Sequence, residues 1–363
     1  MMTSSAIHSD LAIPPGEYLL EVAGDLGISQ ADLARRMGRP PQAINEIIKG
    51  EKMITSETAL QLEQVLAVPA HIWTGLEAEY QLVKARHQDT ETLEQEVRVL
   101  DRFPYRDMAR FQWVEKTRDK LKQVQELRRF FGVASLHNVE GVKAYRPAFR
   151  QAVKSQSSPE ALAAWLRRGE SEARHINTQP YNEQRLKTEL ANIRMLSNQS
   201  SKDFLSRLHT VLAQCGVGFV LQQHLPKTYV NGATFWLAHD KAVLILSIRG
   251  SWADIFWFSL FHEIGHIMLH DRRHTFLEDT ADDPQWKKQE HEADAFARDT
   301  LIPPAEYARF MARREVTTAT IRAFAEEIGI APGIVVGRLQ HDKVLALHQQ
   351  HGLRVRYTEP TIK

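Results

Sequence analysis

Two histidines and a glutamate in the C-terminal half have types and spacing that could bind and use a metal ion. His262 and His266 stand four residues apart in FHEIGHIMLH, residues 261–270, a segment without proline. Residues four apart lie on one face of a helix, and two imidazoles at this spacing can hold one zinc ion. Glu263, next to the first histidine, is placed to remove a proton from an attacking water molecule. The segment therefore predicts a zinc site with a catalytic base.

The metal site needs a third ligand, and two glutamates further along the chain compete for that role. A catalytic zinc ion takes three protein ligands and keeps one position open. A third histidine six residues after the second is excluded, because Arg272 stands there. The other common solution is a glutamate on a following helix. QEHEADAFARDTLIPP, residues 289–304, offers Glu290 and Glu292.

Helical phase separates these two glutamates. At about 100° per residue, Glu290 shares a helix face with Asp294 one turn later. Ala297 and Leu301 continue that face, which indicates that it points inward, whereas Glu292 points nearly opposite. We therefore expect Glu290 to be the third ligand, with Glu292 as the alternative. Asp294 is expected to orient a ligand histidine from behind.

Peptide hydrolysis at such a site also needs a group that stabilises the developing oxyanion. Tyr229, Arg249 and His270 are candidates, and the sequence does not choose among them. His270 is otherwise expected to support the site or lie at the surface rather than to bind the metal. The run ATFWLA, residues 233–238, could form a sheet edge to which an extended substrate adds.

Local signals predict the elements that position these residues. Ser251 could cap the histidine-bearing helix, with Asp254 three residues later completing a capping box. Asn231-Gly232 is a turn signal between strand-like runs. The β-rich runs before the helix are VGFVLQ (217–222), ATFWLA (233–238) and AVLILSI (242–248). A small β-sheet followed by the metal-binding helix is therefore expected.

A second motif lies near the start of the chain. SQADLARRMGRPPQAINEIIKG, residues 29–50, has the spacing of a helix-turn-helix. Ser29 is a good N-cap, Gly38 can end the first helix in the left-handed conformation, and Pro41 suits the first turn of the second helix. The residues expected to pack inward are Leu33, Ala34, Ile44, Ile47 and Ile48.

The second helix of such a motif enters the major groove of double-stranded DNA. The side chains expected to face outward from it are Gln42, Ala43, Asn45, Glu46 and Lys49. Glutamine and asparagine can read adenine through two hydrogen bonds, so Gln42 and Asn45 are the best candidates for base contacts. Candidates for phosphate contacts are Gln30, Arg39, Lys49 and Lys52.

The charge of this segment argues against strong attraction to the DNA backbone. Residues 11–80 contain five basic and ten acidic residues, a net charge of −5. Dimerisation could offset this deficit, as could basic residues further along the chain. These include Arg102, Arg106, Arg110, Lys116 and Arg118.

Length predicts a multidomain chain, and the helix-favouring patterns of its first two parts predict that it is mainly α. Its 363 residues exceed one ordinary core, and its formal net charge is +1. The single cysteine, Cys215, suggests a reducing compartment, and the N-terminus does not resemble a signal peptide. Charges interrupt the most apolar region, so we expect no membrane span and a cytoplasmic protein. The expected parts are a helix-turn-helix bundle (11–86), a helical middle region without a recognised motif (90–212), and an α+β domain with a small sheet (213–345).

The first part resembles the DNA-binding antitoxins of the HigA type, which are XRE-family helix-turn-helix proteins. The resemblance covers residues 13–82: the PGE start, INEIIKG, the ITSETAL that follows, and the late Trp73. It implies a homodimer that binds its own operator, and often a neighbouring RNase toxin as partner.

The last part resembles the ImmA/IrrE family of zinc metallopeptidases from about Val217 to Gln340. The residues that carry the resemblance are AVLILSI, FWFSLFHEIGHIMLH, EHEADAFARDTLIPP and IRAFAEEIGIAPGIVVGRLQH. It implies a zincin-like fold in which a small sheet packs on the metal-binding helix. It also implies cleavage of repressor proteins, often of the helix-turn-helix kind.

Two functions follow from these motifs. In the first, the chain is a DNA-binding regulator whose zinc peptidase domain cuts a repressor, an antitoxin or the chain itself. In the second, it is an antitoxin-like repressor whose zinc domain only senses a signal or binds a partner protein. Replacing Glu263 distinguishes them, because only the first function needs its carboxylate.

Overall fold

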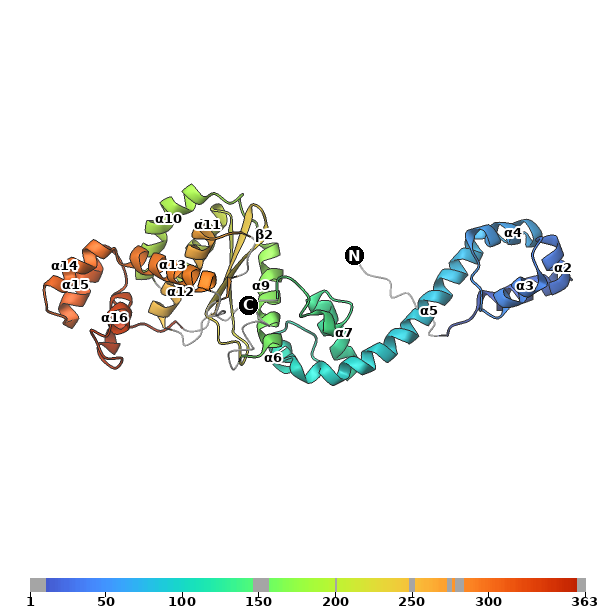
Figure 1. Ribbon diagram of the computed structural model, residues 1–363, viewed down its shortest axis with the longest axis horizontal. Helices are drawn as coiled ribbons and strands as arrows, with labels where there is room; N and C mark the ends of the chain where they lie inside the picture. Colours follow the sequence, from blue (N-terminus) through green and yellow to red (C-terminus); the bar gives the residue numbers. More distant parts are fainter. Residues whose placement is uncertain are drawn as a thin grey trace. The chain divides into compact units, whose positions relative to one another are not determined.

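The computed structural model describes residues 11–145, 157–199, 201–247, 252–272, 276–277 and 284–357. The chain divides into two compact units, Met1–Gln95 and Glu96–Lys363 (Figure 1). It is mainly helical with one small sheet in the second unit, which confirms the predicted fold class. The finer division of the second unit into a middle region and a C-terminal domain stays a prediction.

The first unit is a bundle of helices around its own apolar core. Leu33, Ile44 and Trp73 are among its fully buried side chains. Gly16 lies against the backbone of Ile48, and a Cβ atom there would come within 2.2 Å of the Ile48 carbonyl oxygen. Two helices therefore approach each other closely at this glycine. The helices are α1 (Pro15–Asp25), α2 (Gln30–Arg36), α3 (Pro41–Ile48), α4 (Ser56–Leu66) and α5 (Ala70–Glu96), which ends at the boundary of the unit.

The second unit packs helices on both faces of its sheet. Its α-helices are α6 (Tyr105–Arg110), α7 (Lys120–Phe131), α9 (Pro159–His175), α10 (Glu183–Met195), α11 (Ser201–Gln214), α12 (Ala253–Leu269), α13 (Pro284–Leu301), α14 (Pro304–Ala312), α15 (Thr318–Ile328) and α16 (Pro332–His341). Its 3-10 turns are η1 (Val97–Arg102), η2 (Leu136–Asn138), η3 (Leu196–Asn198) and η4 (His351–Leu353).

The sheet forms where the β-rich runs were expected. Its strands are β1 (Val217–Gln222), β2 (Gly232–Ala238), β3 (Lys241–Ser247) and β4 (Phe276–Leu277), in the spatial order β1-β3-β2-β4. β1 runs parallel to β3, whereas β2 runs antiparallel to both β3 and β4. β2 is therefore not an edge strand, and the expectation that ATFWLA offers a free edge is wrong. β4 already pairs with Ala233 and Thr234.

The central strand β3 is buried on both faces, which explains its unbroken apolar sequence. Leu244 and Leu246 join the core built with α11 and α12. Ile245 points the other way, against Gly169 of α9, where a Cβ atom would come within 2.1 Å of its Cδ1 atom. Within the unit, α12 and α13 lie side by side, and α12 also packs on β2 and β3 (Figure 1).

The start of α12 differs from the expected capping box. The N-cap residue is Trp252, whose side chain makes no capping hydrogen bond, and Ser251 lies outside the described residues. Asp254 instead accepts two hydrogen bonds from Arg354, at 3.1 and 2.7 Å. A buried ion pair with the C-terminal segment takes the place of the local cap.

The Asn231-Gly232 turn signal lies where the segment between β1 and β2 ends, as expected of a signal between strand-like runs. The β2–β3 hairpin turns at His239 and Asp240, whereas Asn231 precedes β2 and Gly232 is its first residue. None of the helices in the described ranges is long and apolar enough to cross a membrane.

Candidate metal centre and DNA-binding surface

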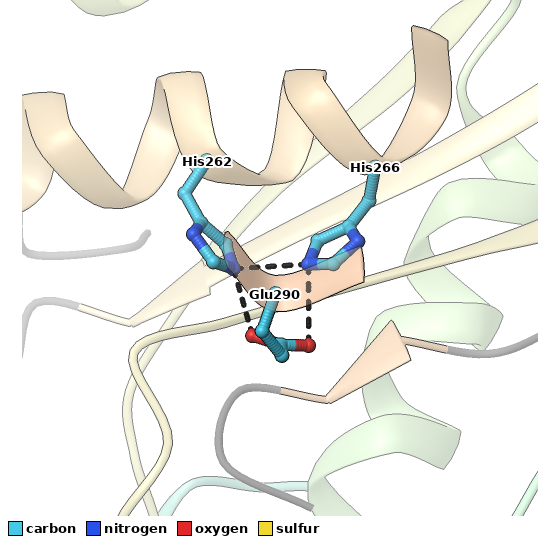
Figure 2. A group of neighbouring side chains, drawn as sticks. All are labelled: His262, His266 and Glu290. Atoms are coloured by element: carbon cyan, nitrogen blue, oxygen red, sulfur yellow. Dashed lines mark hydrogen bonds and ion pairs between the residues drawn. The ribbon is translucent and has the colours of Figure 1, made fainter. Parts of the chain in front are cut away.

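Three side chains from two helices converge on one point (Figure 2). The Nε2 atoms of His262 and His266 are 2.9 Å apart. The Glu290 carboxylate spans both of them, with Oε2 3.3 Å from His262 Nε2 and Oε1 3.4 Å from His266 Nε2. All three donor groups lie within 4.8 Å of one another. Two imidazoles and a carboxylate are the donor set that a zinc ion takes, so these residues fit such an ion.

The packing of α12 on α13 creates this convergence. The two histidines are one turn apart on α12, and Glu290 comes from α13. Gly265, between the histidines, allows the helices to approach closely, because a Cβ atom there would lie 3.2 Å from Ala293 Cα. Ala293 and Ala297 are fully buried, as expected for the inward face of α13. Small residues on both helices therefore bring the donor atoms together.

Each histidine is held on its other ring nitrogen. His262 Nδ1 donates to Asp294 Oδ1 at 2.9 Å, which leaves Nε2 facing the cluster. His266 Nδ1 lies 2.9 Å from Nδ1 of His270, whose Nε2 lies 3.2 Å from Glu292 Oε2. Both glutamates that the sequence left open therefore reach the site region. Glu290 lies against both Nε2 atoms, whereas Glu292 contacts His270.

The electrostatics of the cluster favour a bound positive charge. Burial lowers the pKa of His262, but contacts with Asp294 and Glu290 outweigh it and raise the pKa to about 10. Burial raises the pKa of Glu290, yet both histidines hold it at about 2. Burial lowers the pKa of His266. The carboxylate of Glu290 therefore favours a positive charge beside the two imidazoles.

Glu263 is buried at 1% exposure beside this cluster. Its carboxylate lies against Gly232 at the start of β2, where a Cβ atom would come within 2.5 Å of Glu263 Oε1. A larger residue at this position would push the Glu263 side chain from its place. Besides beginning β2, Gly232 of the Asn231-Gly232 signal therefore marks a close approach of the backbone to the glutamate.

The oxyanion candidates separate in the structure. Tyr229 is 46% exposed and has a φ of 51°, and Arg249 lies outside the described residues. His270 contacts His266 and Glu292, a position that fits the expected supporting role, which stays a prediction. None of these contacts assigns the oxyanion role.

The helix-turn-helix forms as its local signals predict. The Ser29 hydroxyl accepts a hydrogen bond from the Asp32 N–H at 3.2 Å, Gly38 has a φ of 64°, and Pro41 begins α3. The residues expected inward are buried, except that Ile48 is half-buried. They are Leu33, Ala34, Ile44 and Ile47.

Two of the expected DNA contacts differ in the structure. Ala43 is only 6% exposed, so its predicted outward position is wrong. It lies one turn before Ile47 and shares the inward face of α3. Arg39 donates to Gln61 Oε1 at 2.6 Å and to Glu57 Oε1 at 3.2 Å, so its guanidinium is held within the unit.

The remaining candidates are accessible. Gln30, Gln42 and Lys49 are exposed, and Asn45 is half-buried. The Gln42 amide donates to Glu46 Oε1 at 2.9 Å on the same face of α3. This surface carries the amides of Gln42 and Asn45 together with the acidic Glu46.

Two family models match the chain. The Helix-turn-helix model matches residues 20–73, and the IrrE N-terminal-like domain model matches residues 232–340. The second match includes the histidines of α12 and Glu290 of α13. The chain thus joins an XRE-type helix-turn-helix domain to an IrrE-like domain.

Known proteins resemble about a quarter of this chain. Virulence-associated protein I of Dichelobacter nodosus is 35% identical over 83 residues, which are 23% of this chain and 76% of that protein. A solved antidote protein of the HigA family from Coxiella burnetii is 30% identical, covering 23% of this chain and 94% of that chain with a TM-score of 0.22. The Pseudomonas aeruginosa antitoxin HigA, solved with the higBA promoter, is 30% identical, with coverages of 24% and 95% and a TM-score of 0.22.

Proposed function

The chain belongs to the helix-turn-helix family of Virulence-associated protein I and joins that antitoxin-like domain to an IrrE-like domain, and from this premise we propose that it is a DNA-binding regulator with a zinc-dependent peptidase. The peptidase would cut a repressor or antitoxin protein, or the chain itself. One observation carries the peptidase proposal. Two histidines and a glutamate converge within 4.8 Å, beside a buried second glutamate.

The zinc ligands would be His262 and His266 through Nε2, and Glu290 through its carboxylate. When bound, zinc supplies Lewis acidity that activates water and polarises a peptide carbonyl. Asp294 fixes the tautomer and orientation of His262 through the 2.9 Å hydrogen bond at Nδ1. His270 holds His266 in the same way at 2.9 Å.

Glu263 would move the proton. Its carboxylate takes a proton from the attacking water and delivers it to the nitrogen of the breaking peptide bond. The water oxygen forms the new carboxyl group, and the amine leaves protonated. Burial of the Glu263 side chain against Gly232 of β2 would hold its carboxylate in place for both transfers.

The peptidase proposal is tested with Glu263→Gln. Zinc-loaded wild type is incubated with a mixture of bacterial peptides and, separately, alone at high concentration, and new termini are identified by mass spectrometry. Wild type should produce new termini. The variant should produce none while it retains about one zinc per chain. Glu292→Gln is the matched control, because it changes a carboxylate on α13 that contacts His270 instead of the cluster.

A variant that cleaves as well as wild type would exclude Glu263 as the base. Absence of cleavage by wild type would favour the second function, a repressor whose zinc domain senses a signal or binds a partner protein. The same ligand set serves that function, since sensing needs the metal but not the base.

The first unit would bind operator DNA through α3. Gln42 and Asn45 are the proposed base contacts, and Gln30 and Lys49 the proposed phosphate contacts. Arg39 would have to leave Gln61 and Glu57 before it could contact a phosphate. A homodimer would place two α3 helices on one operator and double the number of phosphate contacts, which offsets the acidic charge of the unit.

The DNA proposal is tested with the Gln42→Ala, Asn45→Ala double variant on the DNA upstream of its own gene, at fixed salt. Each good bidentate contact contributes about 1–3 kcal/mol, so the loss of two should weaken binding at least tenfold. Glu51→Ala, outside α3, is the control. DNA recognition through α3 would be contradicted if the double variant bound the DNA as tightly as the Glu51→Ala control. It would also be contradicted if wild type did not bind the DNA.

A further inference from the structure

A cavity of about 520 Å³ lies beside the cluster of His262, His266 and Glu290, between α12, α13 and α16. Its apolar lining includes Phe258, Leu301, Ile302 and Ile334. The last three are nearly fully buried. Cavities of roughly 300–1,000 Å³ with mostly apolar walls are typical of ligand sites. The size and lining therefore suit an apolar group larger than a methyl.

The cavity adjoins the residues that would perform catalysis. Asp294, which lines it, is the hydrogen-bond partner of His262. Ser259 lines it one turn before Glu263 on α12. Asn231 lines it from the strand side, next to the Gly232 that lies against the Glu263 carboxylate. A polypeptide held at the cluster would therefore lie close to this cavity.

Charged groups around the cavity are largely paired inside the unit. Asp254 at its wall accepts both hydrogen bonds from Arg354. Arg338 donates to Asp342 at 2.7 Å, and Arg298 donates to its neighbour Asp299 at 2.7 Å. These pairs leave no large net charge to select an ionic ligand. Apolar contact with the lining therefore decides what the cavity accepts.

We propose that this cavity is a specificity pocket, which binds a large apolar side chain, such as leucine or phenylalanine, next to the peptide bond to be cut. The proposal rests on the peptidase function and names its substrate class: polypeptides with a large apolar residue at one fixed position beside the cleaved bond. In an apolar pocket, each added methylene changes discrimination by about 10-fold or more.

The binding step is tested without catalysis, on the Glu263→Gln protein. The probes are N-acetyl amides of leucine, phenylalanine, alanine and aspartate, and binding is followed by ligand-observed NMR. Leucine and phenylalanine amides should bind at least about tenfold more tightly than the alanine and aspartate amides. Equal binding of all four probes would overturn the proposal.

Variants locate the bound probe. Adding Ser259→Leu fills the cavity and should abolish the preference for leucine. If that variant has a lower melting temperature than the Glu263→Gln protein, Ile255→Trp replaces it. Ile255 lines the cavity and is already 37% exposed, so a larger side chain there disturbs the core less. Leu269→Trp is the control on the same helix, since Leu269 is 50% exposed and does not line the cavity. Persistence of leucine binding in a folded, cavity-filled variant would overturn the proposal.

Cleavage products test the connection to the peptidase. With a bacterial peptide mixture, wild-type products should share a large apolar residue at one position beside the cut, and Ser259→Leu should shift that position to small residues. Cleavage without such a preference would overturn the pocket's role in specificity. No cleavage by wild type would count against the peptidase function, while the NMR comparison still decides what the cavity binds.

Discussion

Zinc affinity should depend strongly on Asp294, although this residue would not touch the metal. Its Oδ1 accepts the hydrogen bond from His262 Nδ1 at 2.9 Å, and its side chain is 51% exposed, whereas that of His262 is 4% exposed. Replacing Asp294 with alanine removes the group that orients the imidazole. Because the aspartate is half in solvent, the change leaves no large buried void, and the fold should persist.

The size of the effect follows from this geometry. Loss of the group behind a ligand histidine typically weakens metal binding by about 10–100-fold. That range corresponds to about 1.4–2.7 kcal/mol. Glu292→Ala is the matched control on the same helix. Its carboxylate is 44% exposed and reaches the cluster only through His270 and then His266, so its replacement should weaken zinc binding less than tenfold.

The assay is competition for zinc between each variant and a chelator of known affinity, with melting temperatures measured on the same samples. Glu290→Ala is included because the loss of a ligand should abolish binding at chelator concentrations that both other variants withstand. The reasoning would be refuted if Asp294→Ala bound zinc as tightly as wild type. An equal loss of zinc affinity in Glu292→Ala would also refute it, since the α13 faces of Asp294 and Glu292 would then contribute equally to zinc binding.

Three further predictions concern packing and stability. Burial raises the pKa of Glu96, but hydrogen bonds from Arg128 and the Leu136 N–H hold it below its usual value of 4.5. The ion pair therefore stabilises the fold above about pH 4.5, and this stabilisation is lost as the pH falls through the lowered pKa of Glu96. Glu96→Ala should lower the free energy of unfolding by about 3–5 kcal/mol at pH 7 and by less at pH 3. Urea unfolding at the two pH values measures both. Gly232→Ala should abolish peptide cleavage while zinc stoichiometry stays the same, because its Cβ would overlap the Glu263 carboxylate; unchanged cleavage would contradict the close approach. Gly16→Ala should destabilise the first unit more than Gly24→Ala, since a Cβ meets backbone at 2.2 Å at the first position and nothing within 4 Å at the second; circular dichroism melting of the full chain compares the two.

Short-range patterns predicted the elements of this protein well. The expected helices begin at Ser29 and Pro41, and Gly38 ends the first of them. Capping and left-handed conformations can be predicted because they depend on a few neighbouring residues. The β-rich runs became strands for a similar reason. The prediction failed at Ala43, which was placed outward although it lies one turn before the buried Ile47 and is itself buried.

Local geometry also allowed the candidate metal ligands to be chosen from the sequence. Spacing of four residues places His262 and His266 on one helix face, and helical phase favours Glu290 over Glu292, so both choices follow from the sequence alone. In the structure the Glu290 carboxylate lies within 3.4 Å of both histidine Nε2 atoms. Local backbone geometry is sufficient for such inferences, since it repeats every turn.

Contacts between segments far apart in the chain required the tertiary structure. Gly232 against Glu263, Asp254 with Arg354, and the cavity between α12, α13 and α16 each join residues that no periodic pattern connects. The sequence by itself determined which residue types are available and which helix faces they occupy. Packing decided which of those faces meet, because the positions of distant segments depend on the whole core rather than on neighbouring residues.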